Sequence, residues 1–516
     1  MFFVSALIGC RNEELFVEAE SFSVKGGWQV DQQFMDVMGS PYLIAHGAGV
    51  PVEDASAQVR LPGKGEWHLF VRTFNWVSPW YDGEGPGKFK VAVDGDELSE
   101  TLGAAGSKWM WQYAGSFETA SRNISVALKD MAGFDGRCDA LYFSRVKNPE
   151  LPEDVAGMRE LRSRLIRNFN VPSDKGQYDL VVAGGGVAGM CAAVAAARQG
   201  LKVALIHDRP VLGGNNSAEV RVHLGGSIEC GPYPNLGNMI KEFGHTKKGN
   251  AKSAENYEDW KKMSFVENEE NISLFLNTHV TDLEMKDGSI EALLARNIET
   301  GELMRFSAPV FSDCTGDASV GYLAGAEWRT GRESLAETGE PGAVEVADRQ
   351  VLGASVQWNS KDMGKPSPFP VFEYGKVFTE ESVQKVKGGE WTWETGMLRD
   401  QVLEAERVRD HGLLVVYSNW SYLKNHSSVK EEFADRALDW VAYVAGKRES
   451  RRLVGDVMLT QNDILGEVPY EDATCATSWS IDLHYPDPAN TAFFPGEEFK
   501  AVCTQEYIEI YPIPYR

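Results

Sequence analysis

Between residues 15 and 147, apolar and polar side chains alternate along short segments that are separated by turn-forming residues. The segments SAQVRLP, EWHLFVRTF, GKFKVAVDGDEL and NISVALKD each place apolar residues at every second position, the period of a half-buried β-strand. Gly, Pro and Asp in PGKG, VDGD and DGEGPGK supply the turns. Short strands at this spacing predict an all-β sandwich or jelly roll over residues 15–147.

A different pattern follows the charged, helix-like linker 148–177. YDLVVAG, starting at Tyr178, is a continuous apolar run typical of a parallel strand buried on both faces. MCAAVAAARQG then reads as a small-sided helix, and KVALIH as a second strand. This order predicts an α/β Rossmann-like domain over 178–331, with a substrate region inserted at 332–445 and a return to the α/β domain at 446–516.

The turn between that strand and helix has the glycine spacing G-x-G-x-x-G, at Gly184, Gly186 and Gly189. The first glycine permits the tight turn, the second lets the backbone approach a pyrophosphate, and the third lets helix and strand pack closely. The pyrophosphate would lie at the helix N-terminus, beside Val187 and Ala188. Together with its flanking elements, the motif predicts a dinucleotide site.

The length, net charge and cysteine spacing of the chain exclude some classes of protein. A chain of 516 residues is too long for one ordinary core, so we expect more than one domain. The net charge of -24 argues against nucleic acid as a partner, because binding phosphates needs clustered Lys and Arg. The 7 cysteines are scattered without a CxxC pair, which indicates neither a zinc site nor a disulfide framework.

The N-terminal residues 1–14 read as a leader. MFFVSALIGC is an apolar run too short to span a bilayer. Its last four residues, LIGC, resemble a bacterial lipobox, in which the cysteine, here Cys10, is acylated after cleavage; the basic residues that usually precede such a run are missing. The resemblance implies an exported lipoprotein, periplasmic or anchored at the outer membrane, and the alternative is a plain apolar leader.

FVEAESF near the start of the β-rich part and DGRCDALYFS near its end resemble the jelly-roll carbohydrate-binding modules. The resemblance implies a structural calcium ion held by Glu18, Glu20 and Asp139; the alternative is carboxylates on exposed strand edges. Four tryptophans lie in or near predicted loops and could stack on sugar rings: Trp76, Trp80, Trp109 and Trp111. The alternative is that the four tryptophans are core residues and that the module is a packing domain fixed to the rest of the protein.

DRPVLGGNNS, NTHV and CTGD resemble the flavin-dependent oxidoreductases of the glutathione-reductase-like superfamily, and Tyr178–Gly226 with GKRESRRLVGD closely resembles the subgroup called FAD-dependent oxidoreductases. The resemblance implies FAD rather than NAD as the cofactor. It implies that Gly213 and Gly214, followed by Asn215, approach the flavin diphosphate, and that the backbone at Val280 lies against the adenine. Thr315, Gly316 and Asp317 would form a turn beside the cofactor. His207 stands where the family has a glutamate for the ribose hydroxyls, so we expect His207 to accept one ribose bond and Asp208 the other.

Candidate proton-transfer and charged groups follow from the same segments. Arg221 and His223 would share one face of an extended segment that emerges beside the flavin. The basic cluster containing Arg451 is either a substrate clamp or a solvated face, and His484 is a second candidate acid or base.

We therefore expect an FAD-dependent oxidoreductase that transfers hydride to or from a sugar or sugar-derived molecule, linked to polysaccharide utilisation. Two alternatives stay open: a carbohydrate-binding protein whose oxidoreductase half is vestigial, and an NAD-dependent dehydrogenase. The chain stops at YIEIYPIPYR, where the family leads into a further glycine-containing strand and helix that support the flavin, so we expect a truncated flavin domain.

Overall fold

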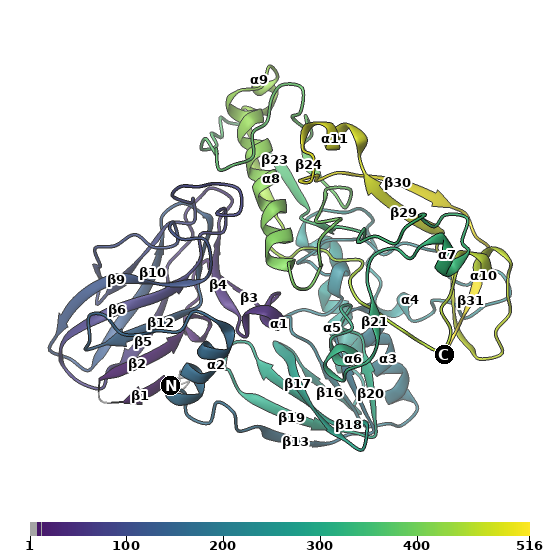
Figure 1. Ribbon diagram of the computed structural model, residues 1–516, viewed down its shortest axis with the longest axis horizontal. Helices are drawn as coiled ribbons and strands as arrows, with labels where there is room; N and C mark the ends of the chain where they lie inside the picture. The colour runs from purple at the N-terminus through teal and green to yellow at the C-terminus, as the bar shows by residue number, and fades with distance from the viewer. Residues whose placement is uncertain (1–7, 12) are drawn as a thin grey trace.

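The computed structural model describes residues 8–11 and 13–516, and Figure 1 shows an all-β module beside an α/β domain. The strands of the module are β1 (Ile8–Arg11), β2 (Glu14–Glu18), β3 (Gln29–Asp31), β4 (Tyr42–His46), β5 (Ala55–Arg60), β6 (Gly65–Thr73), β7 (Phe89–Val93), β8 (Asp96–Glu97), β9 (Met110–Thr119), β10 (Asn123–Asp130), β11 (Phe134–Cys138) and β12 (Ala140–Ser144). A short helix, α1 (Met35–Met38), follows β3.

The module is a sandwich of antiparallel sheets. One sheet has the strand order β1-β2-β12-β6-β9 and the opposite sheet the order β5-β10-β7-β8. Leu69 and Val71 of the first sheet and Val91 and Val126 of the second belong to one buried apolar cluster. Every second residue of these strands therefore reaches a shared core, as the alternating pattern predicts.

Helix α2 (Val155–Leu165) follows the module, and an arginine of this helix binds acidic residues of the module. Arg162 of α2 donates from Nε to Glu18 at 2.7 Å and from Nη2 to Asp139 at 3.0 Å, and Arg72 binds Asp139 at 2.7 Å. Burial, with Glu18 and Asp139 nearby, raises the pKa of Glu20 well above its ordinary value.

The predicted calcium site is not supported by this arrangement. Guanidinium groups occupy the positions around Glu18 and Asp139 that a cation would need, and within residues 8–11 and 13–516 no cluster of His, Cys, Asp or Glu is arranged to hold a metal ion. The three carboxylates are buried, so they are not exposed strand-edge groups either. Glu18 and Asp139 share Arg162 of the connecting helix as a cation, which ties the module to the linker.

The α/β domain is built on a parallel sheet of order β16-β15-β14-β20, formed by β14 (Leu180–Ala183), β15 (Val203–Ile206), β16 (Ile272–Phe275) and β20 (Val310–Asp313). Helix α3 (Val187–Arg198) packs on it through small residues such as Ala193 and Ala197. A second sheet, β13-β19-β18-β17, adds β13 (Ser173–Gln177), β17 (Thr278–Lys286), β18 (Ser289–Asn297) and β19 (Leu303–Ser307).

The remaining elements are short except for one helix. The helices are α4 (Ile240–Phe243), α5 (Asp259–Glu267), α6 (Ser319–Leu323), α7 (Leu335–Thr338), α8 (Ala405–Asn425), α9 (Lys430–Phe433), α10 (Gln461–Leu465) and α11 (Pro488–Phe493). The strands are β21 (Trp328–Arg329), β22 (Ala354–Ser355), β23 (Trp358–Asp362), β24 (Gly388–Gly389), β25 (Glu394–Thr395), β26 (Arg436–Val441), β27 (Arg452–Leu453), β28 (Ala473–Thr477), β29 (Ile481–Pro486), β30 (Ala501–Glu506) and β31 (Tyr511–Pro514). None of the described helices is both long and apolar enough to cross a membrane.

Helix α8 stands beside the module (Figure 1). Trp76, Trp80 and Trp109 of the module pack in one apolar cluster with residues of α8. Trp76 is fully buried, and the indole nitrogen of Trp109 donates to Glu406 of α8 at 3.0 Å. Trp80 stacks on His411 of α8, with ring centroids 5.6 Å apart. Trp111 donates to a backbone oxygen of the linker at 2.9 Å. These rings pack against the rest of the chain, so they do not form an open platform for sugars.

Candidate functional site

A cavity of about 300 Å³ opens where the parallel sheet, the β17 strand and the module meet. Its wall is formed by Gln33, Asp36, Gly184, Gly186, Ile206, His207, Asp208, Arg209, Gly214, Asn215, Glu219, Val220, Thr278, His279, Val280, Cys314, Thr315, Gly316, Asp317, Ser319, Val444, Ala445 and Lys447. The carboxyl ends of β14, β15 and β20 meet there, which is where open α/β sheets bind ligands.

The glycine turn after β14 shows directly why each position lacks a side chain. A Cβ at Gly184, which has φ +102°, would lie 2.2 Å from the carbonyl oxygen of Cys314, and a Cβ at Gly189 would lie 1.8 Å from the carbonyl oxygen of Gly184. At Gly186 a Cβ would meet no protein atom within 4 Å. The first and third glycines are required by protein packing, whereas Gly186 keeps space open in the cavity.

The second glycine pair lies against this turn. The amide of Gly213 donates to the carbonyl oxygen of Gly185 at 2.9 Å, and Gly213 forms a β-bridge with Gly186. Both Gly213 and Gly214 have positive φ, of 113° and 57°, which favours glycine. The structure thus brings the two glycine segments together at one end of the cavity, with Asn215 beside them.

His207 does not have the role expected from the sequence. Its Nδ1 accepts the Gly185 amide at 3.0 Å, and its Nε2 lies 3.0 Å from the carbonyl oxygen of Val211. Burial lowers the pKa of His207, so the ring is neutral and its one acceptor nitrogen is already used inside the protein. The predicted ribose contact of His207 is therefore replaced by a structural one that connects the glycine turn to the loop after β15.

Asp208, the next residue, presents its carboxylate at the cavity wall. It lines the cavity, and its carboxylate lies 3.5 Å from Nδ1 of His279. The other ring nitrogen of His279 lies 2.9 Å from the carboxylate of Asp36 in the module. Burial alone would lower the pKa of His279, but the two carboxylates raise it to about 10, so His279 is a cation held between them.

The turn after β20 forms a further part of the cavity wall. Asp313 accepts hydrogen bonds from the Thr315 amide at 3.1 Å and from its hydroxyl at 2.7 Å, which fixes the turn. Asp317 forms an ion pair with Lys447, and Ser450 donates to the carbonyl oxygen of Gly316 at 3.1 Å. The chain thus returns to the α/β domain at 446–451. Val280 lines the same cavity, beside the predicted turn residues Thr315, Gly316 and Asp317.

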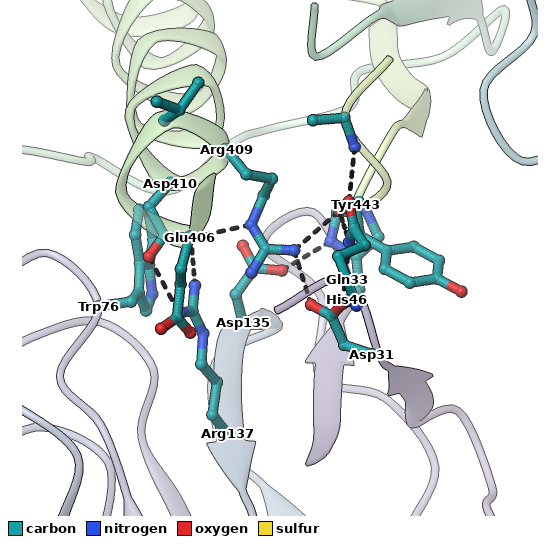
Figure 2. A network of polar contacts seen from close by, with 12 residues as sticks. Asp31, Gln33, His46, Trp76, Asp135, Arg137, Glu406, Arg409, Asp410 and Tyr443 are labelled. Atoms are coloured by element: carbon teal, nitrogen blue, oxygen red, sulfur yellow. Dashed lines mark hydrogen bonds and ion pairs between the residues drawn. The ribbon is translucent and has the colours of Figure 1, made fainter. Parts of the chain in front are cut away.

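Two residues of the module complete the wall, and no local sequence signal points to them. The side chain of Gln33 bonds the backbone at both ends of Val444: it donates to Tyr443 O and accepts from Ala445 N, each at 2.9 Å (Figure 2). Asp36 reaches His279 as described above. Neither residue belongs to a recognisable motif, and each lies more than a hundred positions from the glycine turn.

Arg221 and His223 do not share an extended face. Arg221 has φ +65°, and its guanidinium stacks 4.0 Å from the ring centroid of Trp440 while donating to backbone carbonyls. The Nδ1 of His223 contacts Oδ1 of Asn250 at 2.8 Å. The expectation of one shared extended face is therefore wrong, and neither residue is among the described residues that line this cavity.

Arg451 and His484 lie apart from each other. Arg451 stacks on Tyr322, 3.8 Å from its ring centroid, and lines a neighbouring cavity of about 370 Å³. His484 is buried, with Nδ1 bonded to Glu394 and Nε2 3.4 Å from Nη1 of Arg448. Since Arg448 is the residue directly after Lys447 of the cavity wall, His484 is the predicted acid or base that the structure connects most directly to the cavity. Glu394 was not predicted from the sequence.

Comparisons with known proteins assign a family to the part of the chain that follows the β module. Residues 179–516, more than half of the sequence, match the family described as "FAD dependent oxidoreductase". No curated protein matches the chain. Among solved structures, it is similar to THI4 of Thermovibrio ammonificans, with 16% identity over 37% of this chain and 80% of that one and a TM-score of 0.23.

Two further structures are similar to parts of the chain. Sdh1 of Mycobacterium smegmatis in complex with UQ1 shows 19% identity over 28% of this chain, with a TM-score of 0.20. The match covers only 34% of the Sdh1 chain. A family 35 carbohydrate binding module of Clostridium thermocellum shows 16% identity over 27% of this chain and 97% of that one, with a TM-score of 0.19.

Proposed function

The chain belongs to the FAD dependent oxidoreductase family, and from this premise we propose that it binds FAD in the cavity around Gly186 and uses it to oxidise or reduce a sugar or sugar-derived small molecule. The family membership makes the protein an oxidoreductase. The observation that carries the proposal for the site is the space beside Gly186, where a side chain would meet no protein atom but would fill the cavity.

The residues of the cavity fit the parts of FAD. Gly184–Gly186 and the N-terminus of α3 present backbone amides, which suit a pyrophosphate, and Asp208 presents a carboxylate, which suits ribose hydroxyls. Val280 and Thr278 of β17 supply an apolar and backbone-rich wall for the adenine. When bound, FAD would exchange a hydride with the substrate.

The chain's own residues then position the reacting groups. Lys447 forms an ion pair with Asp317, and Asn215 donates to the carbonyl oxygen of Lys447 at 2.7 Å, so both contacts fix this loop at the cavity wall. Arg448 extends from that loop to His484: its Nη1 lies 3.4 Å from Nε2 of His484, and Nδ1 of His484 is hydrogen-bonded to buried Glu394. We propose that the His484–Arg448 pair handles the proton that accompanies hydride transfer.

The sugar part of the proposal is supported by the resemblance of the leading module to carbohydrate-binding jelly rolls. The burial of Trp76 and the packing of half-buried Trp109 against α8 argue against sugar stacking on the module itself. We therefore favour a substrate that binds at the oxidoreductase half, and not a carbohydrate-binding protein with a vestigial second half. An NAD-dependent dehydrogenase is disfavoured by the family match.

The visible absorption spectrum of the purified protein tests the proposal for the cofactor. A flavin band, with FAD identified after release, is the expected result, and protein that stays colourless after incubation with FAD would overturn it. For the substrate, the bound flavin should bleach anaerobically when the correct sugar or sugar derivative is added. A panel of neutral sugars, amino sugars and sugar acids that leaves the band unchanged would contradict the substrate class.

We also propose that the chain is exported and lipid-anchored through Cys10. The support is the lipobox-like LIGC, part of which falls on residues 1–7, outside the described residues. The backbone of Cys10 itself pairs with Leu15 between β1 and β2. Expression in a bacterial host should give a membrane-bound form labelled by a radioactive fatty acid. Label that persists in Cys10→Ser would contradict the anchor.

A further inference from the structure

We propose that the N-terminal β module is a wall of the cofactor site: Gln33 and Asp36, on the β3–α1 segment, close the cavity and retain FAD in it. This rests on the proposed function, because it assumes that FAD binds around Gly186. It assigns the module a role in cofactor binding, and the residues concerned lie outside the segment 179–516 that matches the family.

The first contact that carries this inference is made by Gln33. Its side-chain amide bonds Tyr443 O and Ala445 N, each at 2.9 Å, in the manner of a strand partner. Val444 and Ala445 line the cavity together with Lys447. A residue of the module thus fixes the backbone of the segment that faces the glycine turn, and without it that segment would lose both hydrogen bonds.

The second contact is the row Asp36–His279–Asp208. All three residues line the cavity, and the distances are 2.9 Å from Asp36 to Nε2 and 3.5 Å from Asp208 to Nδ1 of His279. With both ring nitrogens directed at carboxylates, the imidazolium is fixed in its plane and holds Asp208 toward the cavity. Asp36 thereby orients the carboxylate proposed for the ribose, so it is a positioning residue.

The β3–α1 segment is itself anchored to the oxidoreductase half. Asp31 accepts from Nη1 of Arg409 in α8 at 2.8 Å, and from Nε2 of Gln33 at 2.9 Å (Figure 2). Phe34 and Met38 belong to a buried cluster that includes Ala405 of α8. The segment is therefore held on both sides of Gln33, which is the condition for a rigid wall and not for a mobile loop.

If the module only packed against the second half of the chain, the side chains of Gln33 and Asp36 would have no reason to line the cavity. The module has many contacts with the second half of the chain that are remote from it, such as the bond from the Trp80 indole to Glu497 at 2.9 Å. Gln33 and Asp36 differ from these because both line the cavity together with the glycines of the turn. Asp36 also remains partly exposed, with 29% of its side chain accessible, as expected for a group at the rim of a ligand site.

The experiment measures the dissociation constant of FAD by quenching of flavin fluorescence, with apo-protein melting temperature as a second readout. The variants are Asp36→Asn, which keeps the size of the side chain, and Gln33→Ala. Each is expected to weaken FAD binding about fivefold to tenfold, the effect of losing one or two hydrogen bonds. Asp96→Asn, at an exposed carboxylate in β8 of the same module, is the control for general effects of charge.

Trp80→Phe is the matched control for a loosened interface, because it removes one contact with Glu497 and leaves the cavity wall intact. If it weakens FAD binding as much as Asp36→Asn does, the module acts through packing alone and the inference is wrong. The inference also fails if wild type binds FAD and neither Asp36→Asn nor Gln33→Ala changes the affinity. Wild-type protein that binds no FAD at all would overturn the proposed function, and this inference with it.

Discussion

The guanidinium of Arg137 in β11 meets the carboxylate of Asp410 in α8 with paired hydrogen bonds of 2.9 and 2.5 Å, and both side chains are buried. Asp410 also accepts from Nε of Arg409 at 2.8 Å, and Arg409 continues to Asp31 in the module (Figure 2). His46 of β4 extends this network, with Nδ1 2.6 Å from Asp135 and Nε2 2.8 Å from Val441 O. Charged groups of the β module and of the oxidoreductase half thus lie together in one buried network.

This pair leads to a prediction for stability. Asp410→Asn leaves Arg137 with Glu406 as its remaining carboxylate, and Arg137→Met leaves Asp410 with Arg409 as its remaining cation. Because charge-assisted hydrogen bonds are lost while one ion pair stays, each variant is expected to cost about 1.5–3 kcal/mol of unfolding free energy. The double variant should cost less than the sum of the two single variants. Urea denaturation of all four proteins gives the coupling energy. Additive losses would show that the pair does not act as a unit.

The glycine turn predicts opposite effects at neighbouring positions. Gly186→Val should leave the apo-protein's melting temperature unchanged, because its side chain enters open space, and should weaken FAD binding about a hundredfold or more by filling the cradle. Gly189→Ala should instead destabilise the apo-protein, because its Cβ would meet the carbonyl oxygen of Gly184. Differential scanning calorimetry and FAD titration of both variants make the comparison. Equal loss of stability in the two would contradict this assignment.

His207 is predicted to matter for folding. Replacing it with Leu removes the partners of the Gly185 amide and the Val211 carbonyl group, at a cost of about 2–3 kcal/mol in unfolding free energy. Because burial lowers the pKa of His207, the unfolded chain binds its proton more readily, and the stability from this residue falls as pH drops below about 6.5. Denaturation at pH 7.5 and 5.5 should show a smaller pH effect in His207→Leu than in wild type.

For His279 we predict the opposite pH dependence of stability. Its pKa is raised from 6.5 to about 10, so its stabilising contribution is complete below pH 6.5 and is lost as pH rises toward 10. Asp36 and Asp208 face the ring, and Lys447, Arg451 and Arg209 lie near those carboxylates. Melting temperatures measured from pH 6 to 10 should fall more steeply in wild type than in His279→Gln. Parallel curves would show that His279 is not held as a cation.

His484 is predicted to affect turnover and not cofactor binding. His484→Gln should lower kcat by about tenfold to a hundredfold, because a proton-transfer group is lost, while the FAD dissociation constant stays unchanged. Stopped-flow measurement of flavin reduction and titration with FAD separate the two effects, since only the reduction rate should fall in the variant. If FAD binding weakens and the reduction rate stays as in wild type, His484 serves only to hold the Arg448 loop.

The sequence predicted those parts of the structure whose cause is local. NISVALKD forms β10 (Asn123–Asp130) over its whole length, because alternating burial is visible in the chain itself. The turn of Gly184, Gly186 and Gly189 was recognisable because its glycine spacing lies directly between an apolar strand and a small-sided helix, all within one local segment. In the same way, the T-G-D turn at Thr315 reaches the cavity wall because it directly follows a strand of the parallel sheet.

Residues whose roles depend on distant partners could not be predicted. Gln33 and Asp36 are ordinary polar residues until folding brings them to Ala445 and His279. Glu18 and Asp139 suggest a metal site only as long as Arg162, from the connecting helix, is not known to lie between them. His207 was misassigned because its position in the motif is visible in the sequence, whereas the orientation of its ring toward Gly185 is not.

The cavity wall begins at Gln33 and ends at Lys447, so no shorter stretch of the chain contains the whole enclosure. A ribosome must release the chain well beyond Lys447 before the last wall can fold into place. If FAD binds in this cavity as proposed, it can bind only after most of the chain has been synthesised. If the chain is secreted in an unfolded state, it crosses the membrane without flavin, and its FAD must be acquired in the compartment where it folds.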